Sequence, residues 1–190
     1  MPRNCLPLIL LAGVFAFGSQ VAAGQMIVHA VSGTVKTTNP TSKSIDVDIE
    51  DGSKGHFKIS SGKSVPLSFD DDLRKDSVSP SSTEVGSFVV VYYYGFGDDR
   101  TAVAIKDLGK GPFDKVNGKV VAFDKHGQIL TVLTGKAEIL KFQLSEKAVV
   151  DSGLSVESGK KYNPGKGYTV RVTATGQSGK QTAVFIRSRR

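Results

Sequence analysis

The second half of this chain repeats the first, and this repetition limits the available folds more than any other feature. Between residues 31 and 60, six positions recur 85 residues later without a gap. They are Val31, Gly33, Val35, Val47, Phe57 and Ser60, which recur as Val116, Gly118, Val120, Val132, Phe142 and Ser145. After a four-residue deletion the offset becomes 81, and Gly86, Val89, Val91 and Gly95 recur as Gly167, Val170, Val172 and Gly176. The segment Thr-Ala-Val-x-Ile also occurs twice at this offset, at 101–105 and 182–186. Chance does not explain matching glycines followed by a matching five-residue segment, so we infer an internal duplication.

Each repeat is predicted to form five short strands. β-Branched and aromatic residues alternate with polar ones, and clusters of Gly, Asn, Asp, Pro and Ser separate the runs. The expected strands span 28–37, 44–49, 56–59, 87–94 and 101–106, then 115–123, 128–134, 140–144, 168–175 and 182–188. Five strands per repeat, with the longest connection after the third, favour a small closed barrel, because closure removes exposed strand edges. The expected organisation is a first barrel at 24–108, a linker at 109–114 and a second barrel at 115–190.

Both repeats carry the spaced pattern GxV, (I/L)xV, FxI (FxL in the second repeat), GxxVxV and TAVxI. This pattern resembles the OB-like small-barrel domains of unknown function that are found in exported bacterial proteins, often in tandem. The resemblance covers nearly all of the chain after residue 23 and rests on core and turn positions. It implies an all-β fold of two OB-like barrels in an envelope or secreted protein, and it implies no established reaction.

The first 23 residues have the features of a secretory signal peptide. Arg3 supplies a positive charge, residues 6–17 form an apolar run, and Val21-Ala22-Ala23 precede a cut near Gly24. The apolar run is short for a membrane span, although an uncleaved anchor is the alternative. The sole cysteine, Cys5, would leave with the signal. We therefore expect a periplasmic or extracellular mature protein without thiols, disulfides or a transmembrane segment.

The charge is divided unevenly between the repeats. Residues 24–110 hold ten Lys/Arg and twelve Asp/Glu, about −2 by count, whereas residues 111–190 hold fourteen and six, about +8. A basic half favours acidic partners. The cations expected to gather on one side of the second barrel, around its fourth and fifth strands, are Lys160, Lys161, Lys166, Arg171 and Arg187. They are the candidate residues for binding an anionic polymer, with an ordinary solvated surface as the alternative.

Each repeat also has an apolar outer stripe that the other lacks. In the first repeat the stripe is formed by Phe88, Val90, Tyr92 and Tyr94, and in the second by Val121, Phe123, Ile129 and Leu133. An exposed apolar stripe of this kind is normally covered by another part of the chain, a second protein or a ligand. The two stripes are expected to cover each other within one chain. A homodimer contact and a ligand platform that uses Tyr92 and Tyr94 are the alternatives.

The sequence motifs typical of phosphate-binding, catalytic and metal sites are incomplete in this chain. Residues 57–64 lack the first glycine of a phosphate-binding loop, and Gly-x-Ser-x-Gly does not occur. The histidines His29, His56 and His126 have no second histidine or cysteine at ligand spacing. No cofactor is expected. The run Asp70-Asp71-Asp72 is a weak calcium candidate. The outward residues expected on the second and third strands include no aromatic, which disfavours nucleic-acid binding.

The sequence therefore predicts an exported, non-enzymatic binding or scaffolding module. Its expected partner is an anionic envelope polymer or another envelope protein, and it is expected to be a monomer or a homodimer. An uncharacterised enzyme and a weak calcium binder are the alternatives.

Overall fold

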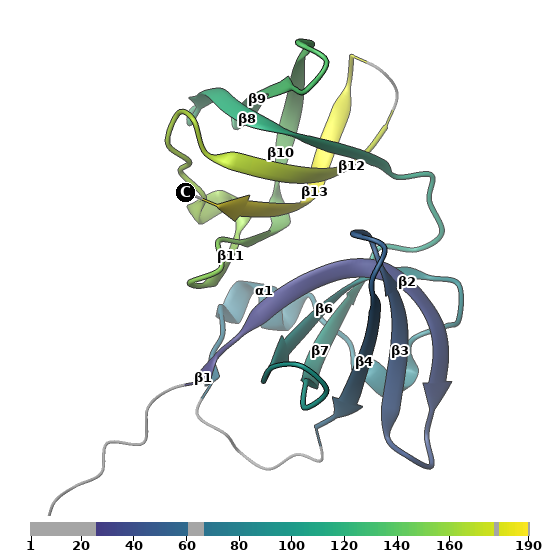
Figure 1. Ribbon diagram of the computed structural model, residues 1–190. Helices are drawn as coiled ribbons and strands as arrows, with labels where there is room; N and C mark the ends of the chain where they lie inside the picture. Colours follow the sequence, from purple (N-terminus) through teal and green to yellow (C-terminus); the bar gives the residue numbers. More distant parts are fainter. Residues whose placement is uncertain (1–25, 61–66, 177–178, 190) are drawn as a thin grey trace, which may run out of the picture.

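The computed structural model describes residues 26–60, 67–176 and 179–189, and it consists of two closed five-stranded β-barrels, one from each half of the chain (Figure 1). The predicted fold is confirmed. The expected signal peptide, residues 1–23, lies outside the described residues. Within the described ranges, no helix has the length and apolar character needed to cross a membrane.

The first barrel has the spatial strand order β2-β3-β4-β7-β6, and pairing of β6 with β2 closes it. Its strands are β2 (His29–Asn39), β3 (Ser44–Ile49), β4 (Lys54–Ile59), β6 (Phe88–Tyr94) and β7 (Thr101–Asp107). Neighbours are antiparallel except β4 and β7, which are parallel. The long connection after β4 carries β5 (Leu67–Ser68), which pairs with β1 (Met26–Ile27), then the helix α1 (Asp71–Lys75) and the 3₁₀ turn η1 (Pro80–Ser82).

The second barrel repeats this plan with one addition. Its strands are β8 (Asp114–Asp124), β9 (Ile129–Thr134), β10 (Ile139–Asp151), β12 (Thr169–Thr175) and β13 (Gln181–Arg189). Pairing of β9 with β10 closes it, and the parallel pair is β10 with β13. The addition is β11 (Val156–Ser158), which pairs with the end of β10 and leads into the 3₁₀ turn η2 (Gly159–Lys161).

The strand registers of the two barrels match at the offsets found in the sequence. Both barrels have a bulge in the first strand and another between the fourth and fifth strands, at equivalent residues. Equivalent pairs include Val35–Val47 and Val120–Val132, Ile45–Phe57 and Leu130–Phe142, and Tyr92–Ala104 and Thr173–Phe185. Bulges are specific features of a strand pair, so their repetition supports the inferred duplication.

The repeated glycine of the first strand has the same physical role in both barrels. A Cβ on Gly33 would lie 2.3 Å from the carbonyl oxygen of Asp48 on the neighbouring strand. A Cβ on Gly118 would lie 2.4 Å from the carbonyl oxygen of Leu133. Both distances are far below van der Waals contact, so each barrel needs glycine where its first two strands approach closely.

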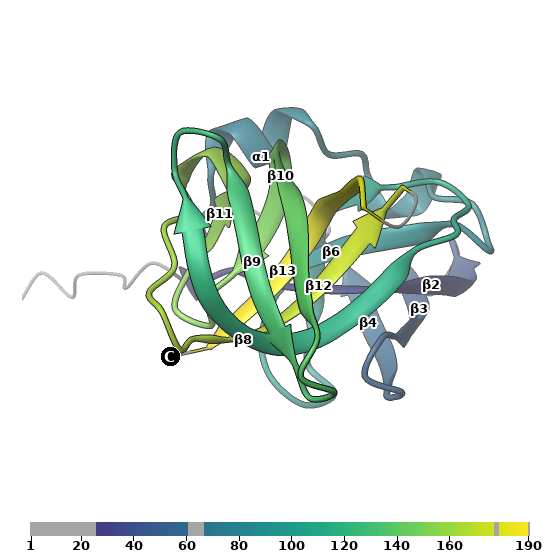
Figure 2. The ribbon, with the colours of Figure 1, turned by 90° about the horizontal axis from the view of Figure 1, so that it is seen from above.

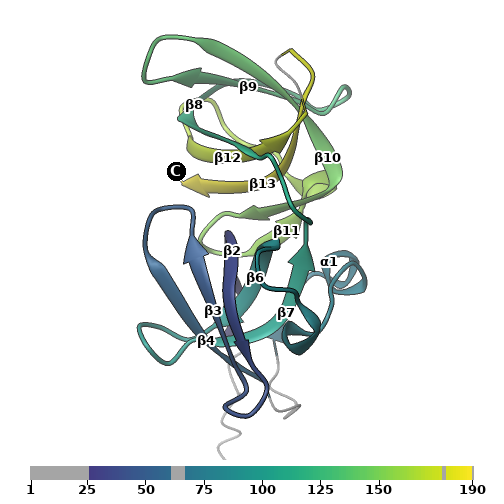
Figure 3. The same ribbon diagram turned by 90° about the vertical axis from the view of Figure 1, so that its right-hand side faces the viewer.

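Each barrel has its own apolar core. The core of the first barrel includes Val35, Ile45, Val47, Phe57, Val91 and Ile105. The core of the second includes Val120, Leu130, Val132, Phe142, Val172 and Ile186. The barrels are stacked, with β10, β11 and β13 of the second facing β2, β6 and α1 of the first (Figures 1 and 3).

Candidate functional site

The apolar outer face of β6 is covered by the second barrel. Val90 and Tyr92 are fully buried in a cluster with Val149, Val156 and Phe185 of the second barrel. The first barrel contributes Val28, Ala30, Leu73 and Ala104 to the same cluster. Burial raises the pKa of the Tyr92 hydroxyl. We call this cluster the seam; it joins the two barrels through a third apolar core, and Tyr92 belongs to that core.

The ends of the same stripe have other environments. Phe88 stacks on Phe113 of the linker, with ring centroids 4.6 Å apart, and the Lys115 ammonium lies 5.5 Å from the Phe88 ring. Tyr94, the last residue of β6, is half-buried and lies outside the seam cluster. The ligand platform that was predicted from Tyr92 and Tyr94 therefore has one of its two rings inside the seam.

The second-barrel residues expected to cover the stripe lie elsewhere. Phe123 packs on its own barrel, 6.1 Å from the ring of Tyr162. Val121 and Ile129 are half-buried, and Leu133 is 37% exposed. This corrects the predicted pairing of the two stripes. The covering surface is built instead by β13 and by the part of β10 that runs beyond the expected strand 140–144 into β11.

A buried carboxylate crosses the seam. Glu50 follows β3, and its carboxylate group accepts a hydrogen bond from Ser32 of the first barrel. It also accepts from Thr173 of the second barrel, with Oγ1 2.8 Å from Oε2 and 3.0 Å from Oε1. Lys115 Nζ lies 3.8 Å away, and the Glu50 side chain is only 2% exposed. A buried charge needs such partners, so Glu50 fixes how the barrels meet.

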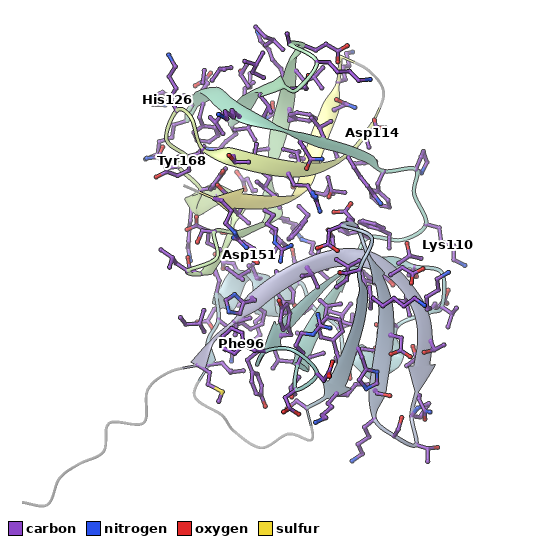
Figure 4. The ribbon with its side chains drawn as sticks, viewed as in Figure 1. Phe96, Lys110, Asp114, His126, Asp151 and Tyr168 are labelled. Carbon is purple, nitrogen blue, oxygen red and sulfur yellow. The ribbon has the colours of Figure 1, made fainter. Side chains whose placement is uncertain are left out.

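A second buried carboxylate belongs to Asp151, at the end of β10, where the barrels meet (Figure 4). Its Oδ2 accepts from the Ala30 amide of the first barrel at 3.2 Å, and its Oδ1 accepts from the Gly153 amide at 2.6 Å. Arg189 lies 3.8 Å from Oδ1. The first barrel therefore supplies a donor to a buried acid of the second, just as the second does for Glu50.

The ion pairs between the barrels all have the same polarity. Within the described residues, each joins an acid of the first barrel to a base of the second. The pairs are Glu50–Lys115 at 3.8 Å, Asp51–Arg187 at 3.7 Å, Asp70–Lys161 at 3.0 Å and Asp76–Lys147 at 3.2 Å. The uneven charge of the two repeats therefore contributes to their docking, and two of the predicted polymer-binding cations take part in it.

Three arginines meet on the outer face of β12 and β13. Arg171 and Arg187 are direct cross-strand partners, and Arg189 lies two residues further along β13. Together with Asp51 and Asn117 they line a hollow of about 230 Å³ beside the seam. Thr169 and Val170 complete the lining. We call this group of three arginines the arginine site.

The charges in the arginine site are only partly compensated. Arg171 Nε donates to the Asn117 side chain at 2.9 Å, which supplies no negative charge. Arg187 is paired with Asp51, but its buried Nε has no hydrogen-bond partner among the described residues. Guanidinium groups bind phosphate, sulfate or carboxylate through paired hydrogen bonds. The hollow therefore has the chemistry of an anion-binding site.

The other predicted cations lie apart from the arginine site. Lys161 binds Asp70, and that hydrogen bond raises the pKa of the lysine. Lys160 lines a separate hollow near α1, and Lys166 is exposed in the loop before β12. The structure thus brings Arg171 and Arg187 together and leaves the three lysines outside the arginine site.

The acidic run has a structural role at its first residue. Asp70 caps α1 by accepting from the Asp72 amide at 3.0 Å, and it also accepts from the Ser158 amide at 3.2 Å. Burial alone would raise the pKa of Asp70, but these hydrogen bonds and the one from Lys161 outweigh burial and lower it. Asp71 and Asp72 are exposed. The structure places no group of three or more His, Cys, Asp or Glu to hold a metal, as far as the described residues go.

A wider groove lies on the outer face of β3 and β4, and its volume is about 600 Å³. His56 Nδ1 lies 2.6 Å from Asp46, whose other oxygen accepts from Thr37 at 2.6 Å. The Thr37 hydrogen bond, followed by that of His56, lowers the pKa of Asp46. Lys36–Asp48 forms a second ion pair there at 3.0 Å. These contacts form a cross-strand charge network at the surface of the first barrel.

Sequence reasoning did not identify Glu50 and Asp151 as residues that join the two barrels. Thr173, the second-barrel partner of Glu50, is 123 positions away from it in the chain, and Ala30, the partner of Asp151, is 121 positions away. Glu50 lies in the turn between β3 and β4, and nothing nearby in the sequence indicates its burial.

Comparisons of the chain with protein-family models and with curated proteins gave no match. The functional argument therefore rests on the chain's own geometry.

Proposed function

We propose that this chain is an exported, non-enzymatic binding module of the cell envelope, and that its arginine site holds anionic groups of a polymer. The observation that carries the proposal is the direct pairing of Arg171 with Arg187 across β12 and β13, beside Arg189. Like charges placed opposite each other on a sheet repel; Asp51 offsets part of this repulsion, and an anion bound between the arginines would relieve the rest. Export is proposed from the signal-like residues 1–23.

The seam supports a site of fixed shape. Asp51 of the first barrel reaches the hollow and pairs with Arg187, while Glu50, the residue before it, is buried and accepts a hydrogen bond from Thr173 of the second barrel. The two barrels are thus tied together beside the arginines. A preformed site loses less conformational entropy on binding, which favours a scaffold over a flexible tail.

The test is binding of residues 24–190, which hold both barrels, to polyphosphate and to heparin. Binding should weaken steeply between about 0.1 M and about 1 M salt, because the Debye length falls from about 10 Å to about 3 Å. The variant Arg171→Gln with Arg187→Gln should lose at least about tenfold in affinity, since two charge-assisted contacts disappear.

The matched control is Lys125→Gln with Lys180→Gln, which removes the same charge from exposed turns of the second barrel. This control should keep most of the parent's affinity for the polymers if the arginine site, and not the net charge of the protein, causes binding. Equal loss in both double variants, with both proteins folded, would refute the proposal, and so would a parent protein that binds neither polymer at low salt.

A further inference from the structure

Two aliphatic side chains on the outer face of the second barrel stay exposed among the residues that the structure describes. Leu133 on β9 and Ile139 on β10 are direct cross-strand partners, and they are 37% and 63% exposed. Half-buried Val121 lies on the neighbouring strand β8, and half-buried Ile129 lies on β9 with Leu133. Seen from above, β8, β9 and β10 lie in front of the other elements, and none of the described strands or helices of the first barrel lies over them (Figure 2). We call Leu133 and Ile139 the aliphatic pair.

The equivalent positions of the first barrel carry different residues. The residues 85 positions earlier are Asp48 and Lys54, which are also cross-strand partners. The first barrel thus has opposite charges, suited to water, where the second has two aliphatic side chains. The strand register at these positions is the same in both barrels, so the difference lies in the surface and not in the fold.

Basic residues surround the aliphatic pair. Lys119 is the cross-strand neighbour of Leu133, and exposed Lys141 lies two residues after Ile139 on β10. Exposed Lys136 lies in the turn that joins β9 to β10. The same row of residues runs on across the barrel from Lys119 through Thr169 to Arg189 of the arginine site. An anionic partner with an apolar interior would match this arrangement.

The small size of the aliphatic pair favours a membrane surface over a protein as the partner. A stable protein interface buries about 1,200–2,000 Å² of surface around an apolar core. Two exposed aliphatic side chains do not make such a core. Shallow contact with a bilayer needs only a few inserted aliphatic groups together with cations near the headgroups.

We propose that the face formed by β8, β9 and β10 of the second barrel docks on the surface of an anionic lipid bilayer, with Leu133 and Ile139 entering the headgroup region. Lys119, Lys136 and Lys141 then lie against the anionic headgroups. The inference goes beyond the proposed polymer binding, because it rests on the aliphatic pair and does not require the arginine site to be occupied.

The test is co-sedimentation of residues 24–190 with vesicles of phosphatidylcholine alone and of phosphatidylcholine mixed with phosphatidylglycerol. The parent should bind the anionic vesicles more strongly. Leu133→Thr with Ile139→Thr should reduce that binding at least about tenfold, because threonine keeps β-propensity but loses apolar surface. Lys119→Gln with Lys141→Gln should weaken binding to the anionic vesicles but not binding to vesicles of phosphatidylcholine alone.

The matched control is Val85→Thr with Leu154→Thr, two aliphatic residues that are 59% and 70% exposed elsewhere on the molecule. This control should bind as the parent does. Equal vesicle binding by the aliphatic-pair variant and the parent would overturn the proposal, as would a parent that ignores anionic vesicles. A homodimer that the Leu133→Thr, Ile139→Thr variant dissociates would also overturn it, by assigning the face to a second copy.

Polymer binding by the same variants separates the two proposals. The aliphatic-pair variant should keep the parent's affinity for polyphosphate, whereas Arg171→Gln with Arg187→Gln should lose it. Lipid docking that fails while polymer binding persists refutes only the inference drawn from the aliphatic pair.

Discussion

Thr173 of the second barrel donates its hydroxyl hydrogen to the buried carboxylate of Glu50 in the first, 2.8 Å from Oε2. The same carboxylate accepts from Ser32 and lies near Lys115. Its partners thus come from both barrels, and removal of any one leaves a buried charge less well compensated. The stability of the contact between the barrels should therefore depend on each polar group that binds the Glu50 carboxylate.

Thr173→Val should lower the free energy of unfolding by about 1–3 kcal/mol, because it removes one hydrogen bond to a buried charged group and leaves the shape nearly unchanged. Urea unfolding followed by circular dichroism measures the change. Thr175→Val, on the same strand but exposed, is the control and should stay within about 0.5 kcal/mol of the parent. Equal stability of Thr173→Val and Thr175→Val would contradict the role given to Glu50.

Tyr92→Ala and Phe185→Ala remove one large side chain from each side of the apolar seam. Each should cost about 3–5 kcal/mol, as deletion of a buried aromatic does in other cores. The loss should appear as a weakened link between barrels, with one unfolding transition separating into two. Phe96→Ala is the control, because Phe96 is 82% exposed on the first barrel (Figure 4). A single, unshifted transition in both seam variants would show that the barrels do not stabilise each other.

The fold was predictable from the sequence because both repeats obey the same packing constraints. Alternating residues such as Val35 and Val120 mark the inward face, and glycines such as Gly33 and Gly118 mark close approaches of the backbone. Two copies of one pattern fixed the phase of each strand, which a single copy would leave ambiguous. The same phase correctly placed Val90 and Tyr92 on the outer face of β6, away from the barrel core.

The covering surface was not predictable from that repeat. Val149 and Val156 lie beyond the third strand expected at 140–144, in a segment where the two halves cannot be aligned without a gap. In the structure this segment lengthens β10 and adds β11, and no strand among the described residues of the first barrel pairs with β4 in the corresponding way. The arginine site was partly predictable, since Arg171 and Arg187 were among the cations expected to gather around the fourth and fifth strands of the second barrel. The position of Asp51 beside them depends on how the barrels dock, and no local pattern encodes that.

Gly33→Ala and Gly118→Ala should destabilise the protein by similar amounts, about 1–3 kcal/mol or more, because each new methyl group would overlap a backbone carbonyl oxygen on the next strand. Thermal unfolding of the two single variants measures this. Gly135→Ala is the control, since a Cβ there meets no atom within 4 Å. A large cost in one barrel and none in the other would contradict the equivalence of the two positions.

Acid should weaken the docking of the barrels through Asp70 and Asp51. Burial opposes the shift at Asp70, but hydrogen bonds from Lys161 and from the Asp72 and Ser158 amides lower its pKa in the folded protein. At Asp51, the hydrogen bond from Ser53 is the largest cause of a lowered pKa, and the charge of Arg187 adds to it. The unfolded value for Asp is about 3.9. A carboxyl whose folded pKa lies below its unfolded pKa stabilises the fold fully above that unfolded value, and this contribution is lost as the pH falls through the folded value.

The melting temperature should therefore change little from these groups between about pH 7 and pH 5, and it should fall below about pH 4. Asp70→Asn keeps a helix-capping side chain but removes the titrating group, so its melting temperature should start lower at neutral pH and fall less in acid. Asp71→Asn removes an equal charge one residue along, where the side chain is exposed, and should follow the parent. An acid-induced decrease of the same size in the parent and in Asp70→Asn would show that the Asp70–Lys161 contact does not couple the barrels to pH.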